Sequence, residues 1–277
     1  MSMSNATHFP PLDGFGPTRK TLQLYARALS ALARAHAPAH PNWWHISLKV
    51  TPTGLVTDNI PCGGGGILAG EMNFHRHELI LTSSDGRAWA LPMDAGLSGS
   101  AMGDRVLAAA SAAGLAGDVD RARFASEEPG LYDKDSVKLF FTALVRADRS
   151  FKRHAARLGK ECGPVRLWPH GFDLSMEWFG TRVERYNEGG KTVELPAQLN
   201  LGFYPGEDDE TSYFYSNPWP FDTDKLLNQS LPPGVEWHTD GWQGTILPYK
   251  EARDEDQILE YAMAVYRIAT PLLNALA

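Results

Sequence analysis

The chain has 277 residues, of which 43% are hydrophobic and 21% charged, and its net charge is −7. These values are ordinary for a globular protein. Lys and Arg are spread along the chain without a basic stripe, which excludes nucleic acid as a partner. The chain lacks an apolar run of the roughly 18 residues that a membrane helix needs, so no membrane association is expected.

The two cysteines, Cys62 and Cys162, lie far apart and have no metal-binding spacing. Such sparse cysteines predict a reducing compartment and no disulfide framework. The first residues are polar and rich in Pro and Gly, without the basic start and apolar core of a signal peptide. We therefore expect a cytoplasmic protein.

The first part of the chain is predicted to form a helix, three strands and a second helix. Pro17 suits a first helical turn, and the helix should end before Pro38. Alternating side chains predict strands over 43–50, 71–81 and 87–93, with a tight turn at 84–86 and a flexible glycine run at 62–66. A helix rich in small residues follows over 100–113.

The second part repeats this outline. An amphipathic helix is predicted from Asp133 or Asp135 to Leu158. Strands are predicted over 166–179, 197–206 and 211–220, and a loop or short strand pair over 235–249. The final helix, 254–276, begins with three acidic residues that suit the positive end of the helix dipole.

These elements predict an α+β fold with a mostly antiparallel sheet flanked by helices, because the helices do not alternate with every strand. We divide the chain into an N-terminal extension (1–16), a first half (17–116), a linker (117–132) and a second half (133–277). WWH at 43–45 corresponds to WPH at 168–170, about 125 residues later. Whether the halves arose by duplication, and whether they pack as one domain, both stay open.

The segment 166–179 shows the clearest alternation. Asp173, Ser175 and Glu177 point to one face, and six mostly apolar residues point to the other: Trp168, His170, Phe172, Leu174, Met176 and Trp178. Asp173 and Glu177 should lie about 13 Å apart, too far to share a proton. We expect Asp173 to form a structural ion pair with Arg166 or with an Arg of the preceding helix.

Asp148 falls inside the apolar stripe of the helix that ends at Leu158. An unpaired buried carboxylate is costly, so a partner is required. Arg149 points elsewhere, and we therefore expect a partner from outside the helix.

Several segments resemble a bacterial family of unknown function, domain-of-unknown-function family 5996. The resemblance rests on WWHISLKVTPTGLVT, ALVRADR, PVRLWPHGFDLSM, LGFYPG, YFYSNPWP and ILPY, and it covers nearly the whole chain. It implies a compact cytosolic protein and brings no activity, cofactor or catalytic residue.

Aromatic side chains beside isolated polar groups suggest a ligand pocket. We hypothesise that the two Trp-His segments line one concave site, where imidazoles would handle protons near neutral pH. The candidate ligand-binding residues are Trp43, His45, Trp168, His170, Tyr204, Tyr215 and His238. His238 and Asp240 form an H-x-D set, but no compact ligand spacing supports a metal site.

The favoured function is binding of a small molecule in an aromatic and histidine-lined pocket. Two alternatives stay open: a non-catalytic interaction or scaffold protein, and a hydrolase that uses a His base or a metal. The sequence names no cofactor and no oligomeric state. A single cavity would favour the first function, and a flat exposed aromatic patch the second.

Overall fold

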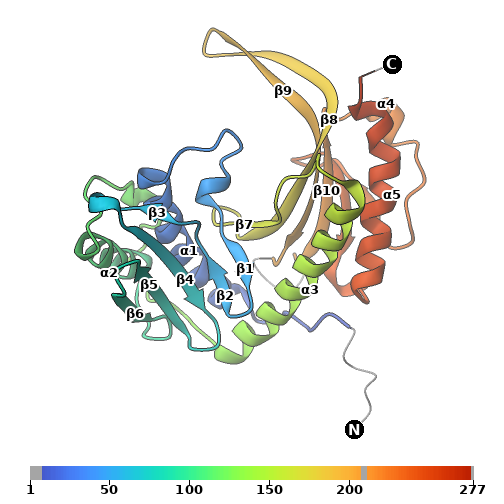
Figure 1. Ribbon diagram of the computed structural model, residues 1–277. Helices are drawn as coiled ribbons and strands as arrows, with labels where there is room; N and C mark the ends of the chain where they lie inside the picture. The colour runs from blue at the N-terminus through green and yellow to red at the C-terminus, as the bar shows by residue number, and fades with distance from the viewer. Residues whose placement is uncertain (1–7, 207–210, 276–277) are drawn as a thin grey trace.

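The computed structural model describes residues 8–206 and 211–275, which form five α-helices and two antiparallel six-stranded sheets (Figure 1). The predicted α+β class is therefore confirmed. Within the described residues, no helix is both long enough and apolar enough to cross a membrane.

The first sheet is a meander packed against two helices. Its order is β1-β2-β4-β5-β6, and β3 pairs with β4. Leu29 of the first helix lies against Gly70, where an added Cβ would come within 2.5 Å of the leucine Cδ2. The elements are α1 (Gly16–His36), the 3-10 turn η2 (Trp44–Ile46), β1 (Lys49–Thr51), β2 (Gly54–Val56), β3 (Ile60–Pro61), the 3-10 turn η3 (Gly63–Gly65), β4 (Ile67–Asn73), β5 (Glu78–Ser83), β6 (Ala88–Pro92) and α2 (Gly99–Ala112).

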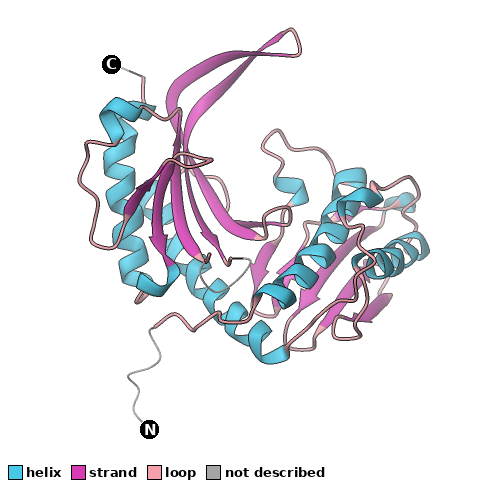
Figure 2. Cartoon of the chain, turned by 180° about the vertical axis from the view of Figure 1, so that it is seen from behind, coloured by secondary structure: helices cyan, strands magenta, loops and turns pink. Residues whose placement is uncertain are grey.

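The second sheet has the order β11-β12-β10-β9-β8-β7. Two helices, α3 and α5, cover one of its faces, and its other face is turned toward the first half (Figures 1 and 2). The elements are the 3-10 turn η4 (Arg121–Arg123), α3 (Lys134–Leu158), β7 (Arg166–Trp168), β8 (Asp173–Glu188), β9 (Lys191–Tyr204), β10 (Tyr213–Trp219), α4 (Thr223–Leu226), β11 (Glu236–His238), β12 (Gly244–Pro248), the 3-10 turn η5 (Tyr249–Glu251) and α5 (Glu255–Leu273).

The helix-covered face of the second sheet forms the core of this half. Phe214 of β10 packs edge-on against Phe151 of α3, with ring centroids 6.3 Å apart. Thr245 of β12 shares a 2.9 Å hydrogen bond with Tyr261 of α5. Among the described residues, no helix packs in this way across the opposite face, which the first half contacts through Arg19 and Trp44. We call it the uncovered face.

The two halves meet along their first strands and through α1. Leu48 and Leu167 exchange two backbone hydrogen bonds of 2.9 Å, which links the edges of the two sheets. One face of α1 also binds the turn between β7 and β8. Arg19 donates to the Gly171 carbonyl at 2.9 Å, and Gln23 and Arg27 each donate to the His170 carbonyl at 2.6 Å. We call this set the α1–turn contact.

The predicted strand over 43–50 is wrong for its first part. Trp44–Ile46 is a 3-10 turn, and Trp43 before it has φ 59°, in the left-handed region. The Ile46 and Ser47 N–H groups donate to the carbonyls three residues earlier, so the backbone is satisfied locally and does not join a sheet. The strand begins only at Lys49.

The predicted strand over 166–179 is likewise broken. The Phe172 N–H donates to the Trp168 carbonyl at 2.7 Å, and Phe172 has φ 59°, so 169–172 form a turn between β7 and β8. From Asp173 onward the predicted alternation holds, because Leu174, Met176 and Trp178 are buried against the helices.

A single predicted strand over 71–81 is in fact a hairpin. The Asn73 side chain accepts the backbone N–H groups of His75 and Arg76, and His77 has φ 55°. These contacts turn the chain between β4 and β5.

Asp148 is buried as predicted, but the expectation of a partner from outside the helix is wrong. Lys152, one turn later in α3, places its ammonium group 2.7 Å from Asp148 Oδ2. A lysine at this spacing can reach back while its own amine stays half-exposed. Asp148 Oδ1 is buried and has no hydrogen-bond partner within residues 8–206 and 211–275, and burial raises the pKa of this carboxyl.

Candidate functional site

Strand register gathers aromatic and carboxamide side chains on the uncovered face of the second sheet. On β9 and β10, Tyr204 lies opposite Tyr213, and Asn200 lies opposite Asn217. Between them, Tyr215 lies opposite Gly202, where an added Cβ would approach the tyrosine ring within 2.1 Å. The glycine therefore lets the Tyr215 ring lie directly on the sheet.

Asp173, the first residue of β8, supplies the carboxylate of this group. The Tyr215 hydroxyl donates to Asp173 Oδ2 at 2.5 Å. Burial raises the pKa of Asp173, and the Tyr215 hydrogen bond together with the charges of His170 and Arg19 offsets this only in part. Burial also holds the pKa of Tyr215 well above 10, so the phenol stays protonated and remains the donor.

Trp242, from the loop between β11 and β12, closes the group. Its ring centroid lies 6.3 Å from that of Tyr213 and 5.9 Å from that of Tyr215. Together these side chains line a pocket of about 290 Å³ formed by Asp173, Asn200, Tyr204, Tyr213, Tyr215, Asn217 and Trp242. We call it the sheet pocket.

Two polar atoms in the sheet pocket lack partners. Asn200 Oδ1 and Asn217 Oδ1 are both buried, and neither accepts a hydrogen bond from the described residues of the protein. Leaving a buried acceptor unpaired costs about 1–3 kcal/mol, so a protein retains such groups where they serve another purpose. Rotation of either amide exchanges its oxygen and nitrogen, and the pair can therefore offer acceptors or donors to a ligand.

Arg19 joins the sheet pocket to the α1–turn contact. Its guanidinium donates to the Tyr204 hydroxyl at 3.4 Å and lies 5.1 Å from the centroid of the same ring. The position of one pocket wall is therefore fixed by the helix that also holds the β7–β8 turn.

Glu177 lies farther along the uncovered face of β8. It accepts a 3.2 Å hydrogen bond from the indole N–H of Trp44, which belongs to the first half. Burial raises the pKa of this carboxyl, and the Trp44 hydrogen bond partly offsets the shift. This contact is a second link between the halves and is not part of the pocket lining.

Of the residues predicted to bind a ligand, Tyr204 and Tyr215 come together in the sheet pocket, and Asp173, predicted only as structural, joins them. Trp43, His45, Trp168 and His170 are not among the lining residues. His238 is not a lining residue either, but its ring packs against that of Trp242, with centroids 4.4 Å apart.

The segment that contains His45 forms its own small cluster. His45 is buried, and its Nδ1 accepts the His40 backbone N–H at 3.1 Å. Burial, together with the charges of Arg34 and His40, lowers its pKa. Trp43 is 52% exposed, stacks on His45 and lies under the guanidinium of Arg34 at 4.5 Å. These contacts are structural, and the His45 nitrogen Nδ1 is already occupied by the hydrogen bond from the His40 backbone N–H.

His170 is exposed in the turn between β7 and β8. Among the described residues, the only aromatic ring that its imidazole contacts is that of Trp168, with ring centroids 6.0 Å apart. Its backbone carbonyl, not its imidazole, makes the α1–turn contact.

The expected ion pair between Asp173 and Arg166 is wrong. Arg166 instead pairs with Asp58 of the first half, at 3.1 Å between Nη2 and Oδ2. The two side chains point to different neighbours because the turn at 169–172 places β7 antiparallel to β8, with Arg166 opposite Ser175. Arg166 therefore links the two halves, and Tyr215 is the partner of Asp173.

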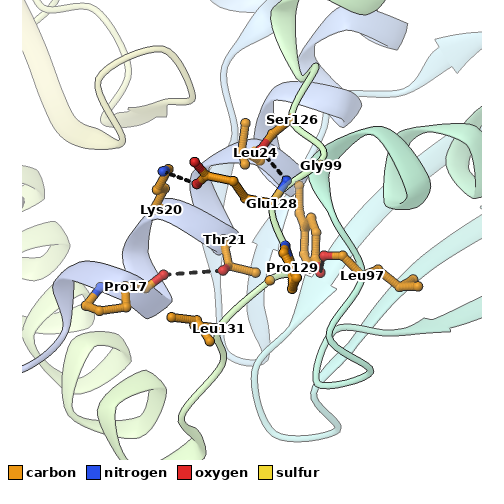
Figure 3. A pocket seen from close by; sticks show the side chains of 12 residues that line it. Pro17, Lys20, Thr21, Leu24, Leu97, Gly99, Ser126, Glu128, Pro129 and Leu131 are labelled. Carbon is orange, nitrogen blue, oxygen red and sulfur yellow. Dashed lines mark hydrogen bonds and ion pairs between the residues drawn. The ribbon is translucent and has the colours of Figure 1, made fainter.

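A second pocket, of about 270 Å³, lies between the first turns of α1 and the segment 97–131 (Figure 3). Its polar groups already have partners. Lys20 pairs with Glu128 at 2.5 Å, and the Thr21 hydroxyl donates to the Pro17 carbonyl at 3.3 Å. The Tyr25 hydroxyl beneath them donates to the Leu97 carbonyl at 2.7 Å. We therefore take the sheet pocket as the candidate site.

The sequence did not single out Asn200, Asn217 or Trp242. The two asparagines have the same parity along their strands as Tyr204 and Tyr215, and this is the signal that could have found them. Trp242 lies in the loop between β11 and β12, and the periodicity of side chains predicts nothing about where a loop residue lies. In residues 8–206 and 211–275, no group of three or more His, Cys, Asp or Glu side chains is placed to hold a metal ion.

Comparison with curated proteins and with solved structures found no match. A family model described as "Family of unknown function (DUF5996)" matches residues 9–274. The match covers both halves and every residue of the sheet pocket, and the chain belongs to this family.

Proposed function

We propose that this protein binds a small molecule in the sheet pocket. The observation that carries the proposal is the pair of buried, unpartnered carboxamide oxygens of Asn200 and Asn217 among three tyrosines and a tryptophan. Ligand pockets combine apolar and aromatic walls with a few convergent polar groups, and this pocket has that composition.

The position of the pocket supports the same proposal. The sheet is packed from behind by α3 and α5, and all pocket residues except Trp242 project from three paired strands on the opposite face. Sites built on such elements keep their geometry better than sites built on loops. Only Trp242 comes from a loop, so it is the wall with the greatest freedom to adjust to a ligand.

A thermal-shift screen of metabolites tests the proposal. A ligand at 100 times its Kd should stabilise the folded state by about 2.7 kcal/mol, which raises Tm by roughly 5–10 °C in a chain of this size. Tyr213→Ala removes a pocket wall and should abolish the shift. Tyr186→Ala removes an exposed tyrosine from the same sheet, outside the pocket, and should retain it.

Two results would contradict the proposal. One is a broad screen in which no compound raises Tm of the wild-type chain. The other is a ligand whose shift survives in Tyr213→Ala and in Asn217→Ala, because such a ligand would bind elsewhere.

We further propose a cytoplasmic location. The support is that Cys62 and Cys162 are both free thiols, as expected in a reducing compartment. Fractionation of cells that express the chain at its natural level, followed by immunodetection, would test this.

A further inference from the structure

Three rings of the sheet pocket pack together into one aromatic surface. The centroids of Tyr213, Tyr215 and Trp242 are 5.9–6.3 Å apart. The Tyr213 and Trp242 rings are inclined by only 25°, and Tyr215 stands at 72° and 70° to them. A group seated against this triangle can lie within about 6 Å of all three centroids, the range in which a cation is attracted by an aromatic face.

The charge of the pocket has the matching sign. Asp173 is the only ionisable acid or base among the seven lining residues apart from the tyrosines, and no basic side chain lines the pocket. The hydrogen-bond donor to Asp173 is a neutral phenol, which leaves its negative charge in place when the carboxyl is ionised. An anionic ligand would meet this carboxylate, while Arg19 lies outside the lining and already donates to Gly171 and Tyr204.

Another ring of the same pocket, that of Tyr204, already accepts a cation. The Arg19 guanidinium lies over Tyr204, on the α1 side, with its carbon 5.1 Å from the ring centroid. Arg19 belongs to α1 and is not a lining residue, so it does not occupy the pocket. At about 290 Å³, the pocket is at the lower end of the usual 300–1,000 Å³, which favours a small head group.

Resting on the proposed binding function, we infer that the sheet pocket selects a small organic cation of the alkylated-ammonium class. The three rings hold the apolar alkyl groups and the positive charge, Asp173 supplies the counter-charge, and the Asn200 and Asn217 amides bind polar atoms on the rest of the ligand.

A matched pair of probes separates charge from shape. Choline carries a quaternary nitrogen, and 3,3-dimethylbutan-1-ol has the same outline with a neutral carbon in its place. In titrations followed by calorimetry or by NMR of the tryptophan side chains, choline should bind at least tenfold more tightly than the alcohol. Equal affinity for the two probes would overturn the inference.

Variants test the residues separately. Tyr213→Leu keeps an apolar wall but removes the ring, and it should lower choline affinity at least tenfold. Asp173→Asn keeps a group that can accept from Tyr215, and it should lower choline affinity while leaving binding of the neutral alcohol unchanged. Tyr186→Leu serves as the matched control and should leave both affinities unchanged. Retention of full choline affinity by both pocket variants would contradict the assignment.

The pH dependence adds an independent measure. The groups that act on Asp173 are Tyr213 and Tyr215 of β10, His170 of the turn and Arg19 of α1. Choline affinity should rise with pH as Asp173 ionises, and Asp173→Asn should flatten this rise. A rise that persists in Asp173→Asn would assign the titration to another group and contradict the role of this carboxylate.

The failure of this inference is distinguishable from the failure of the binding function. If neutral sugars or other uncharged compounds bind in a Tyr213-dependent way and choline and tetramethylammonium do not, the pocket binds ligands but not this class. If neither these cations nor any compound of a broad screen binds, both proposals fail.

Discussion

The two sheets have the same construction but present different uncovered faces. Both are antiparallel and are covered by helices on one side. In the first sheet the uncovered positions carry small or aliphatic side chains such as Ala69 and Ile80, and Glu71 there accepts from Thr53 and Asn73. In the second sheet the corresponding face carries tyrosines and two asparagines. The amide oxygens of these asparagines have no hydrogen-bond partner among the described residues. The two sheets therefore differ in the side chains that this face presents: the second gathers aromatic rings and amides into a pocket, which the positions named on the first sheet do not.

The largest effect is expected from crowding the uncovered face of the second sheet. Gly202→Val would place side-chain atoms where the Tyr215 ring lies, since an added Cβ already comes within 2.1 Å of it. Displacing this ring and its hydrogen bond to Asp173 should lower the free energy of unfolding by about 2–3 kcal/mol.

Ala69→Val makes a comparable enlargement on the first sheet, where Ala69 is partly exposed. Its effect should stay within about 0.5 kcal/mol in urea denaturation. Similar losses for the two variants would mean that the two faces are equally packed, and the contrast between them would be lost.

Two asparagines should respond in opposite directions. Asn217→Leu removes a buried unpaired oxygen and should stabilise the fold by about 1 kcal/mol while abolishing ligand binding. Asn73 of the first sheet bonds Glu71 and two backbone N–H groups of its turn, so Asn73→Leu should destabilise by about 1–3 kcal/mol. Destabilisation by both variants would show that the Asn217 oxygen is in fact satisfied.

Two carboxylates should show opposite pH dependence. Burial acts to raise the pKa of Asp58, but its bonds with Lys49 and Arg166 outweigh burial and lower it, whereas the pKa of Asp173 is raised. The stability from Asp58 is therefore present above its unfolded pKa near 3.8 and is lost as pH falls through the folded value. For Asp173, stability declines instead as pH rises from 3.8 through the raised folded pKa.

Denaturation measurements on Asp58→Asn and Asp173→Asn between pH 3 and pH 7 test the direction in which stability changes with pH for each carboxyl. Relative to the wild-type chain, the loss of stability in Asp58→Asn should grow with pH. The relative stability of Asp173→Asn should increase with pH. Parallel trends would contradict the difference in environment between the two groups.

The smallest effect is expected at His170. Its ring is exposed, and its contact with α1 runs through the backbone carbonyl, which any residue supplies. His170→Ala should change the free energy of unfolding by less than about 0.5 kcal/mol and leave ligand affinity unchanged. A loss of binding in this variant would place the imidazole at the site after all.

The periodicity of apolar side chains correctly predicted the parts of this fold in which a helix or strand runs without interruption. The amphipathic pattern that ends at Leu158 placed α3, and the alternation from Asp173 to Trp178 placed each side chain on the correct face. It failed at Trp43 and Phe172, because both adopt left-handed backbone angles that end a strand and that no apolar pattern reveals.

The site was predicted in fragments for a related reason. The sequence identified Tyr204, Tyr215 and Asp173 but did not show that they meet, because their meeting depends on the register among β8, β9 and β10. The matching WWH and WPH segments gave a more conspicuous signal, yet their imidazoles take up local contacts in separate places. Conspicuous residue types were a weaker guide here than the parity of residues on neighbouring strands.

The α1–turn contact also has a consequence for dividing this chain into fragments. A break within 117–130 would leave α1 on one fragment and the carbonyls of residues 169–171 on the other. The first fragment would then carry Arg19, Gln23 and Arg27 without the carbonyls of residues 170 and 171, and the second would lose the helix that positions Tyr204. We expect each fragment to be poorly soluble alone and the two to reconstitute when they are produced together, so the chain is a candidate for a split reporter.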